Sequence, residues 1–265
     1  MEPKGIVPIR IGGLGNQMFI VAASYVAHKE SKSPLYILQQ PKNNKHNSTN
    51  NYNISIFKYF GIHLSISQDN TLPNYSTFFN SDGFAKWNPS SIQAGTRMSS
   101  YFQYYPALEP YEDDIRFLFL RGLDEYRSKI NDSYYDCAFL HIRRGDYLNL
   151  PDFHYNQSLD YYKQASEIIK KTGVTKIVVI SDDLSWVRQQ EMFKEETYEL
   201  YDSTDELQSL ALMSKCTAGA ICANSTFSWW GAFLGAHRAR KTCIVPEKWI
   251  VLPIVSLFPK EWIII

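Results

Sequence analysis

The sequence lacks an excess of charge and a long apolar run. Lysine plus arginine and aspartate plus glutamate number 27 each, so the formal net charge is zero at pH 7. A neutral chain gives no support for a broad surface that binds nucleic acid or an anionic membrane. No stretch approaches the roughly 18 consecutive apolar residues of a membrane helix. We therefore expect neither a nucleic-acid partner nor a transmembrane segment.

The sequence also lacks a secretory signal and closely spaced cysteines. Its N-terminal apolar stretch is short and is interrupted by Pro8 and Arg10. The four cysteines have no CxxC spacing, and each lies in or beside an apolar run. We therefore expect a cytoplasmic protein whose cysteines are reduced and buried, rather than paired in disulfides or bound to a metal.

Motifs for metal binding are missing as well. The sequence contains no Asp-x-Asp pair and no HExxH motif. Asp182 and Asp183 form the one adjacent acidic pair that follows a strand-like run, but no further ligand stands at a recognisable spacing from them. We predict that the protein needs no metal and no other cofactor.

What is present indicates a globular α/β protein. The chain has 265 residues, of which 45% are hydrophobic and 15% aromatic. This length suits one large α/β domain or two smaller ones. In the second half, apolar runs typical of strands alternate with segments of helical periodicity, and the connections between them are short. This order predicts a parallel, doubly wound sheet. We place the boundary at the Asn131–Ser133 turn, so that the halves are residues 1–131 and 132–265.

The expected elements follow from apolar periodicity and turn residues. In the second half we expect strands at 135–141, 176–180, 218–223 and 242–245, and helices over 159–169, after 203–206 and over 229–236. Ser158 is the expected cap of the first of these helices, and Ser203 with Glu206 the expected capping box of the second. In the first half we expect strands at 6–11 and 35–38, helices over 18–29 and 115–130, and a polar loop over 41–52. The aromatic run 101–105 is either a strand that faces a sugar or part of the core.

One heptapeptide, His141–Tyr147, concentrates charge directly after an expected strand. Two guanidinium groups, an imidazole and a carboxylate lie within six residues, an arrangement that is unfavourable unless it faces a ligand. Parallel α/β sheets bind their ligands beyond the carboxyl ends of the strands. We therefore predict an anion site here, for a phosphate or a diphosphate.

Two further polar clusters, Ser181–Asp183 and Asn224–Ser228, also follow expected strands. In a parallel sheet all three clusters lie at the same edge. Backbone N–H groups at helix starts, paired arginines and hydroxyl groups all bind phosphate oxygens. A carboxylate such as Asp182 is a suitable partner for a ribose or for the N–H edge of guanine. Together the three clusters predict a pocket for a nucleoside diphosphate.

A glycine turn, Gly12–Gln17, connects the first expected strand to the first expected helix. This order is typical of a loop that cradles phosphate. The turn fails the dinucleotide fingerprint, however, because Met18 stands where the third glycine would be. A plain tight turn between a strand and a helix is the alternative.

Four blocks of the sequence together resemble glycosyltransferase family 11, the α-1,2-fucosyltransferases. They are GGLGNQMF from Gly12, HIRRGDY from His141, VVISDDLSW from Val178 and ANSTFSWWGAFLG from Ala223. The blocks occur in the right order over nearly the whole chain, whereas residues 40–130 show no recognisable motif. The resemblance implies a GT-B-like fold of two facing Rossmann-type halves with the active site in the cleft between them. The first half would be the acceptor side, and the second would bind a GDP-sugar donor.

The resemblance also implies an activity and the residues that perform it. The reaction would move L-fucose from GDP-β-L-fucose to the 2-hydroxyl of a terminal galactose on a glycan, with inversion and without a metal. Arg143 would hold the β-phosphate and help GDP to leave, and Asn16 would point at the glycosidic oxygen. The remaining substrate contacts would come from His141, Arg144, Gly13, Gly15, Asp182, Asn224, Ser225, Thr226, Phe227 and Ser228.

Some alternatives stay open at the level of sequence. Asp146 is either the general base for the acceptor hydroxyl or an ion-pair partner that orients the arginines. Trp229 and Trp230 fit helix packing better than a sugar platform, and Asn224 fits a helix cap as well as a ligand contact. The activity could instead be that of another GDP-sugar-dependent transferase with a different linkage or acceptor. A non-catalytic module that binds a nucleotide sugar or a glycan is the third alternative.

Overall fold

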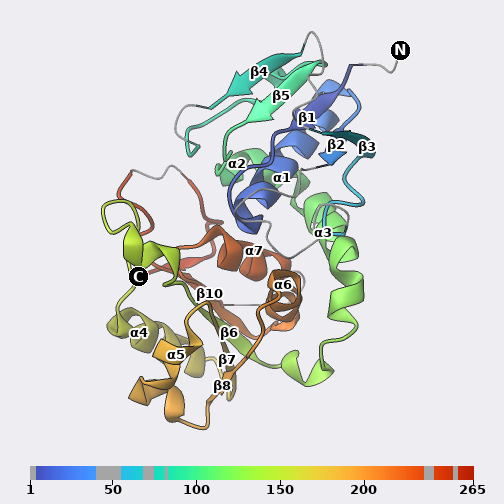
Figure 1. The fold of residues 1–265 in the computed structure, drawn as a ribbon. Helices are drawn as coiled ribbons and strands as arrows, with labels where there is room; N and C mark the ends of the chain where they lie inside the picture. Colours follow the sequence, from blue (N-terminus) through green and yellow to red (C-terminus); the bar gives the residue numbers. More distant parts are fainter. Residues whose placement is uncertain (1–3, 40–54, 68–74, 81–82, 236–241, 253–255) are drawn as a thin grey trace. The chain divides into compact units, whose positions relative to one another are not determined.

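The computed structural model describes residues 4–39, 55–67, 75–80, 83–235, 242–252 and 256–265, which form two compact units (Figure 1). Unit 1 comprises Met1–Asp124 and Ile254–Phe258, and unit 2 comprises Glu125–Pro253 and Pro259–Ile265. The division falls inside helix α3 (Glu112–Arg127), earlier in the chain than the predicted boundary between residues 131 and 132. The polar loop predicted at 41–52 lies outside the described residues.

Unit 1 contains short parallel strands and the long helix α1. One sheet has the order β1-β5-β4, and a second pairs β2 with β3. An isolated bridge between Ile6 and Leu35 connects β1 to the chain just before β2. The predicted first strand and helix are confirmed, although the helix begins earlier, inside the glycine turn. The elements are β1 (Ile6–Pro8), α1 (Leu14–Ser31), β2 (Tyr36–Gln39), β3 (Ile62–Ser67), β4 (Ser76–Phe79), β5 (Thr96–Ser99), α2 (Tyr105–Leu108) and the first part of α3.

The aromatic run 101–105 is not a strand, which corrects one of the two alternatives. Phe102 has a φ of 51° and a fully buried ring. That ring stacks on Phe78 with 6.1 Å between centroids and meets the edge of Trp87 at 5.4 Å. A left-handed backbone is unfavourable for a bulky residue, so the packing of the buried ring has to stabilise this conformation of Phe102. The run turns the chain from β5 into α2, and Phe102 belongs to the core.

Unit 2 is built on one six-stranded parallel sheet, in the order β11-β10-β9-β6-β7-β8. The four strands predicted in this half are confirmed with slightly different bounds. The short outer strands β8 and β11 were not predicted. β8 alternates over only three residues, whereas β11 lies in the apolar run Trp262–Ile265, which the sequence analysis left unassigned. The strands are β6 (Ala138–Ile142), β7 (Ile177–Ser181), β8 (Tyr198–Leu200), β9 (Gly219–Ile221), β10 (Thr242–Val245) and β11 (Ile263–Ile264).

Helices cover both faces of this sheet (Figure 1). The predicted cap of α4 is confirmed, because Ser158 Oγ accepts a hydrogen bond from Tyr161 N at 3.2 Å. The predicted capping box of α6 is wrong: Asp205 caps this helix, by accepting from the N–H groups of Leu207 and Gln208. The helices are α4 (Leu159–Lys170), α5 (Leu184–Arg188), α6 (Glu206–Lys215) and α7 (Thr226–Gly235).

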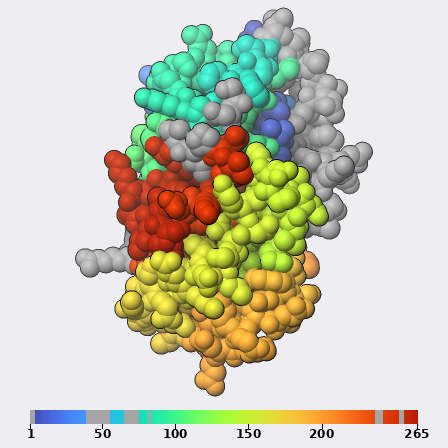
Figure 2. Space-filling model, turned by 90° about the vertical axis from the view of Figure 1, so that its left-hand side faces the viewer, coloured from blue at the N-terminus to red at the C-terminus, as the bar shows by residue number. Residues whose placement is uncertain are grey.

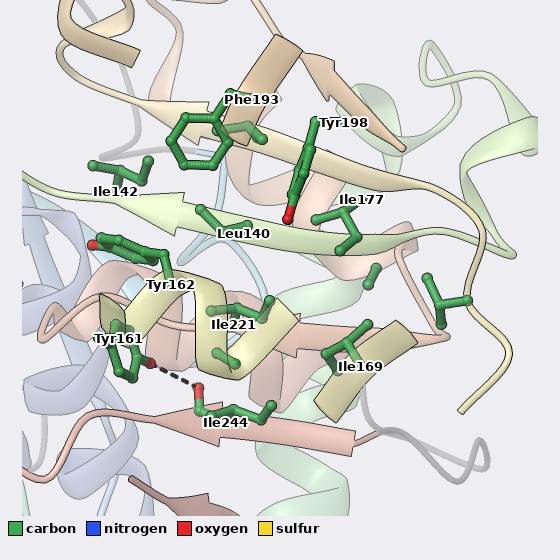
Figure 3. Close-up of a cluster of buried hydrophobic side chains, with 14 of the residues drawn as sticks. Leu140, Ile142, Tyr161, Tyr162, Ile169, Ile177, Phe193, Tyr198, Ile221 and Ile244 are labelled. Carbon is green, nitrogen blue, oxygen red and sulfur yellow. Dashed lines mark hydrogen bonds between the residues drawn. The ribbon is translucent and has the colours of Figure 1, made fainter. Parts of the chain in front are cut away.

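The core of unit 2 lies between the sheet and α4 (Figure 3). Leu140 and Ile221 from adjacent strands and Ile169 from α4 are each fully buried, and burial of such side chains is the main favourable term in folding. Trp229 and Trp230 of α7 are also fully buried, with their rings edge to face at 4.9 Å. Their predicted role in packing is therefore confirmed.

The order of the strands reverses next to β6. From β6 the chain adds β7 and β8 on one side, and β9, β10 and β11 follow on the other. Ligands of open α/β sheets bind where the order reverses, beyond the carboxyl ends of the two strands.

The four cysteines are free and buried, which confirms the prediction for them. Within the part of the chain that the structure describes, no helix is both long and apolar enough to cross a membrane.

Candidate functional site

The three polar clusters of unit 2 follow three neighbouring strands. β6 pairs in parallel with β7 on one side and with β9 on the other. The clusters His141–Asp146, Ser181–Asp183 and Asn224–Ser228 therefore leave the sheet at the same edge. The prediction that they share an edge is confirmed, and the first and third clusters flank the point where the strand order reverses.

Arg143 lies at the centre of this group and is held by two carboxylates. Its Nη2 is 2.7 Å from Asp146 Oδ1, and its Nη1 is 3.2 Å from Asp182 Oδ2. Burial opposes the charge, but the carboxylates of Asp182 and Asp146 outweigh it and raise the pKa of Arg143. The side chain keeps 32% of its surface exposed. It is thus a permanent cation in a fixed position with a face open to a ligand.

The aspartates after β7 hold the arginine loop, Arg143–Asp146, from the other side. Asp182 Oδ1 accepts a hydrogen bond from Arg144 N at 2.9 Å. Asp183 Oδ2 accepts from Arg144 Nε at 3.1 Å, and the guanidinium lies 4.0 Å from the centre of the Trp186 ring. The two oxygens of Asp182 are engaged by Arg143 and Arg144. Its contact with a nucleotide stays a prediction.

Gly145 leaves room for the carboxylate of Asp182 beside the loop. A Cβ atom added there would lie 2.6 Å from Asp182 Oδ2, well inside van der Waals contact. The glycine lets the loop pass close enough to Asp182 for the ion pair with Arg143 to form. Its place in the heptapeptide thus has a local steric reason.

His141 is buried at the end of β6, with 3% of its surface exposed. Its ring lies 5.6 Å from that of Phe227, and its Nδ1 has no hydrogen-bond partner among the described residues. Burial, together with the positive charge of Arg143, lowers the pKa of His141 to about 3. The imidazole is therefore neutral, and a polar ligand group would satisfy its buried nitrogen.

The residues at the start of α7 lie in two environments. Thr226 and Phe227 are partly exposed, whereas Ser225 and Ser228 are buried. Ser225 Oγ accepts from Phe227 N at 3.3 Å. Ser228 Oγ donates to two backbone oxygens of the same turn, Ala223 O and Ser225 O. The hydroxyl of Ser228 shapes the turn and presents no surface to a ligand in this structure.

Asn224 connects three segments and is not the cap of α7. Its Nδ2 donates to Tyr155 O and to Trp249 O, each at 2.8 Å. Its backbone oxygen accepts from the Tyr147 hydroxyl at 3.0 Å. Its Oδ1 is buried and has no partner among the described residues. The residue holds the loops around the arginines together.

The glycine turn belongs to unit 1. Gly12 has a φ of 74°, and an added Cβ would lie 2.8 Å from Asn16 Nδ2. Asn16 Oδ1 accepts from Gln103 Nε2 at 3.1 Å, and Gln103 is itself buried. The side chain of Asn16 is thus fixed on two sides, at the start of α1. Its contact with a glycosidic oxygen stays a prediction.

Gly13 and Gly15 differ in what surrounds them. Gly13 precedes the first residue of α1, and a Cβ added there would meet nothing within 4 Å. Gly15 is buried in the first turn of the helix. Only Gly13 therefore leaves its backbone open to an approaching group.

Sequence reasoning missed several residues of these two groups. Asp183 was part of the predicted cluster Ser181–Asp183, and Tyr147 ended the predicted heptapeptide, but neither was assigned a contact. The sequence contains no signal for Gln103, because this residue approaches Asn16 across a long sequence separation. Among the described residues, no group of three or more His, Cys, Asp or Glu side chains is placed to hold a metal ion. Metal independence stays a prediction.

A hollow of about 280 Å³ lies elsewhere in unit 1. Val26 and Glu30 line it from the last turns of α1, and Trp87 and Tyr104 add aromatic surface. Glu30 lies fourteen residues after Asn16 on the same helix, which corresponds to roughly 20 Å along its axis. This hollow is therefore separate from the glycine turn.

Comparisons with known proteins agree on one family. Residues 94–265 match the model of glycosyl transferase family 11. The chain is 29% identical to the O-antigen biosynthesis glycosyltransferase WbnK of Escherichia coli, over 90% of this chain and 92% of that protein. It is 27% identical to an α-1,2-colitosyltransferase of the same organism, over 95% and 96%.

Solved structures agree on the fold. The α-1,6-fucosyltransferase NodZ of Bradyrhizobium, in a crystal soaked with GDP-fucose, superposes with a TM-score of 0.54. The match covers 88% of this chain and 93% of NodZ at 11% identity. At this identity the likeness concerns the fold alone, and it confirms the predicted GT-B-like architecture.

Proposed function

The chain belongs to glycosyl transferase family 11, and we propose that it transfers L-fucose from GDP-β-L-fucose to the 2-hydroxyl of a terminal galactose. The observation that carries the proposal is Arg143 at the sheet's switch point, held between Asp146 and Asp182 with one face exposed. A fixed cation at this place suits the diphosphate of a nucleotide sugar. The product linkage would be α-1,2, formed with inversion.

The proposal assigns the main catalytic task to Arg143. Glycosyl transfer passes through an oxocarbenium-like state in which negative charge gathers on the departing GDP. Arg143 meets that charge without a metal, and the neutral His141 and the start of α7 complete the nucleotide side. Losing an arginine contact of this kind costs about 3–5 kcal/mol, or roughly 10²–10⁴-fold in rate. Asp146 and Asp182 would aim the guanidinium.

The names of the similar proteins support the donor and the linkage separately. A fucosyltransferase of this fold was soaked with GDP-fucose, and a relative in sequence forms an α-1,2 linkage. The second of these transfers colitose, which makes a colitosyl donor the second candidate for this chain. Arg143 would serve both donors, because it meets the nucleotide and not the sugar.

The test is donor consumption with and without an acceptor. The purified protein is incubated with GDP-fucose and lactose, GDP release is followed, and the linkage in the product is determined. We expect release that depends on lactose and an α-1,2-fucosylated galactose. Tight GDP binding without turnover on any galactoside would contradict the activity. Turnover of a colitosyl donor in preference to GDP-fucose would select the second candidate.

Metal independence is tested in the same assay. If Arg143 and the N-termini of helices neutralise the charge of the leaving group, no metal is needed. Excess EDTA is therefore expected to leave the rate unchanged. A rate that falls with EDTA and returns with a divalent cation would contradict this part of the proposal. The rate of Arg143→Ala in the same assay shows how large the decrease is when the diphosphate is no longer stabilised.

A further inference from the structure

The proposed transfer releases a proton from the acceptor hydroxyl, and this proton needs a base. Asp146 is the carboxylate at the centre of the site, but its Oδ1 lies 2.7 Å from Arg143 Nη2. To take a proton, Asp146 would have to give up part of this ion pair, just as Arg143 has to stabilise the departing GDP. A group that is neutral at rest and close to the arginine loop fits the task better.

His154 is such a group. Its ring stacks on Tyr147, with 3.8 Å between centroids and 4° between planes. Tyr147 in turn lies beneath the Arg143 guanidinium, 5.6 Å from ring centre to carbon. His154 is therefore one aromatic ring away from the cation proposed to hold the diphosphate. It lies outside every recognised sequence block and has no role in the site described above.

The backbone around His154 is held on both sides. His154 N donates to Leu150 O at 2.9 Å, and an antiparallel bridge pairs His154 with Ile250. Asn224 Nδ2 donates to the next carbonyl, Tyr155 O. In Figure 2 the yellow-green segment around residue 150 and the red segment near residue 250 lie side by side on the surface. The imidazole thus sits on a supported loop at the surface of unit 2.

The two ring nitrogens of His154 differ in their surroundings. Nδ1 is enclosed and has no hydrogen-bond partner among the described residues. The residue as a whole is only half-buried, so Nε2 is the nitrogen available to a ligand. Desolvation lowers the pKa of His154, the charge of Asp146 opposes that shift and the charge of Arg143 adds to it. The imidazole is neutral at pH 7.

We propose that His154 is the general base that accepts the proton of the acceptor hydroxyl. This role rests on the proposed transferase function. The resting proton is assigned to Nδ1, so that Nε2 carries the lone pair. The acceptor oxygen forms a bond to C1 of the sugar while its proton passes to Nε2. The bond from C1 to the phosphate oxygen breaks, and GDP leaves with the bonding electrons. Asp146 then faces the imidazolium and stabilises its charge.

The test compares His154→Gln and His154→Ala with His63→Gln, in which the replaced histidine is exposed on strand β3. General base catalysis contributes about 10²–10⁴-fold in rate. Both His154 variants are expected to lose transfer by such a factor and to keep the GDP dissociation constant within about twofold, because the nucleotide does not touch the base. Added imidazole is expected to restore part of the rate of His154→Ala. His63→Gln is expected to transfer like the wild type.

The pH profile gives a readout that a structural role would not move. Wild-type transfer should fall at low pH as His154 takes up a proton, with an apparent pKa below the ordinary 6.5. The charged or titratable groups that face it are Asp146 and Arg143, with Tyr147 beneath the ring; the paired segment contributes Ile250 and Val251, which do not titrate. The acidic limb is expected to disappear in His154→Gln.

The outcomes separate the two proposals. No transfer by the wild type on any galactoside would overturn the proposed function and the role of His154 with it. Transfer by the wild type, with His154→Gln retaining its rate and its acidic limb, would overturn the role of His154 alone. Loss of GDP binding in both His154 variants would also overturn it, since the residue would then act on the donor. Loss of transfer with intact GDP binding and imidazole rescue supports it.

Discussion

The arginine loop of unit 2 (Arg143–Asp146) and the glycine turn of unit 1 (Gly12–Gln17) place their side chains by opposite means. Arg143 is held by ion pairs with Asp146 and Asp182. Asn16 is held by a left-handed glycine before it and by the uncharged Gln103. The loop is thus organised by charge, and the turn by backbone shape.

This difference predicts that substitutions in the two segments have different effects on ligand binding and on stability. Ion pairs that are partly exposed contribute only about 0–1 kcal/mol to stability, so the charges of the loop can be changed with little effect on folding and a large effect on an anionic ligand. A glycine with positive φ is a requirement of the backbone itself. Its replacement should destabilise the fold of unit 1 whether or not a ligand is present.

The largest effect is expected for Arg143→Ala. Without its cation, the site loses the group that meets the diphosphate, and kcat/KM for GDP-fucose should fall at least about 10²–10³-fold. The free energy of unfolding should change by no more than about 1 kcal/mol. Arg143→Lys is the control that keeps the charge and loses the bidentate geometry, and it should fall between the two. Equal rates for all three proteins would show that Arg143 does not contact the donor.

The next effect concerns the loss of stability in acid that the buried His141 causes. Burial and Arg143 lower the pKa of this imidazole to about 3. Below about pH 6.5 the unfolded chain binds a proton there and the folded protein does not. The free energy of unfolding should therefore decrease as the pH falls, by up to about 1.4 kcal/mol per pH unit. Urea unfolding of the wild type and of His141→Gln between pH 7 and pH 5 measures this decrease. The variant should lack the part of the pH dependence that His141 causes. Parallel curves of stability against pH would contradict the lowered pKa of His141.

In the glycine turn, Gly12→Ala should destabilise the protein by about 1–2 kcal/mol, the usual cost of a left-handed residue with a Cβ. The matched control is Gly13→Ala, because Gly13 has a φ of −66° and an added Cβ meets no atom within 4 Å. Urea unfolding of the two variants measures the difference. Equal stabilities would mean that the turn is not held by its backbone conformation.

A smaller effect is expected from a methyl group in the arginine loop. In Gly145→Ala the new Cβ would displace the Asp182 carboxylate from Arg143. We expect a decrease in kcat/KM of about tenfold, or ~1.4 kcal/mol, with nearly unchanged stability. In a double-mutant cycle with Asp182→Ala, the added methyl should have no further effect. Full additivity would show that the clash with Asp182 is not the cause.

Much of unit 2 could be predicted because its signals are local. Apolar runs such as that before His141 marked four of the strands, and polar clusters after them marked the edge where they meet. The same locality explains the errors. Ser203 has the right spacing for a capping box, but Asp205 is nearer to the helix start and accepts two N–H groups. The chain's return to unit 1 at Ile254–Phe258 left no periodic signal.

The partners of the site residues were harder to predict than the residues themselves. The sequence did not indicate that Asp182 would pair with Arg143, because the neighbours that engage a carboxylate depend on distances of a few ångströms between the ends of β6 and β7. Gln103 reaches Asn16 directly after Phe102, where the chain turns with a positive φ. His154 gains its surroundings from the stacking on Tyr147. Such contacts join residues far apart in the sequence, and no spacing rule reports them.

The central claim is that Arg143 binds the β-phosphate of the nucleotide, and calorimetric titration with GDP and GMP tests it most directly. The two ligands differ by the β-phosphate alone. The wild type is expected to bind GDP at least about 30-fold more tightly than GMP, which corresponds to roughly 2 kcal/mol. Arg143→Ala should bind the two nucleotides with nearly equal affinity. A variant that keeps the full preference for GDP would contradict the account, because the β-phosphate would then be held elsewhere.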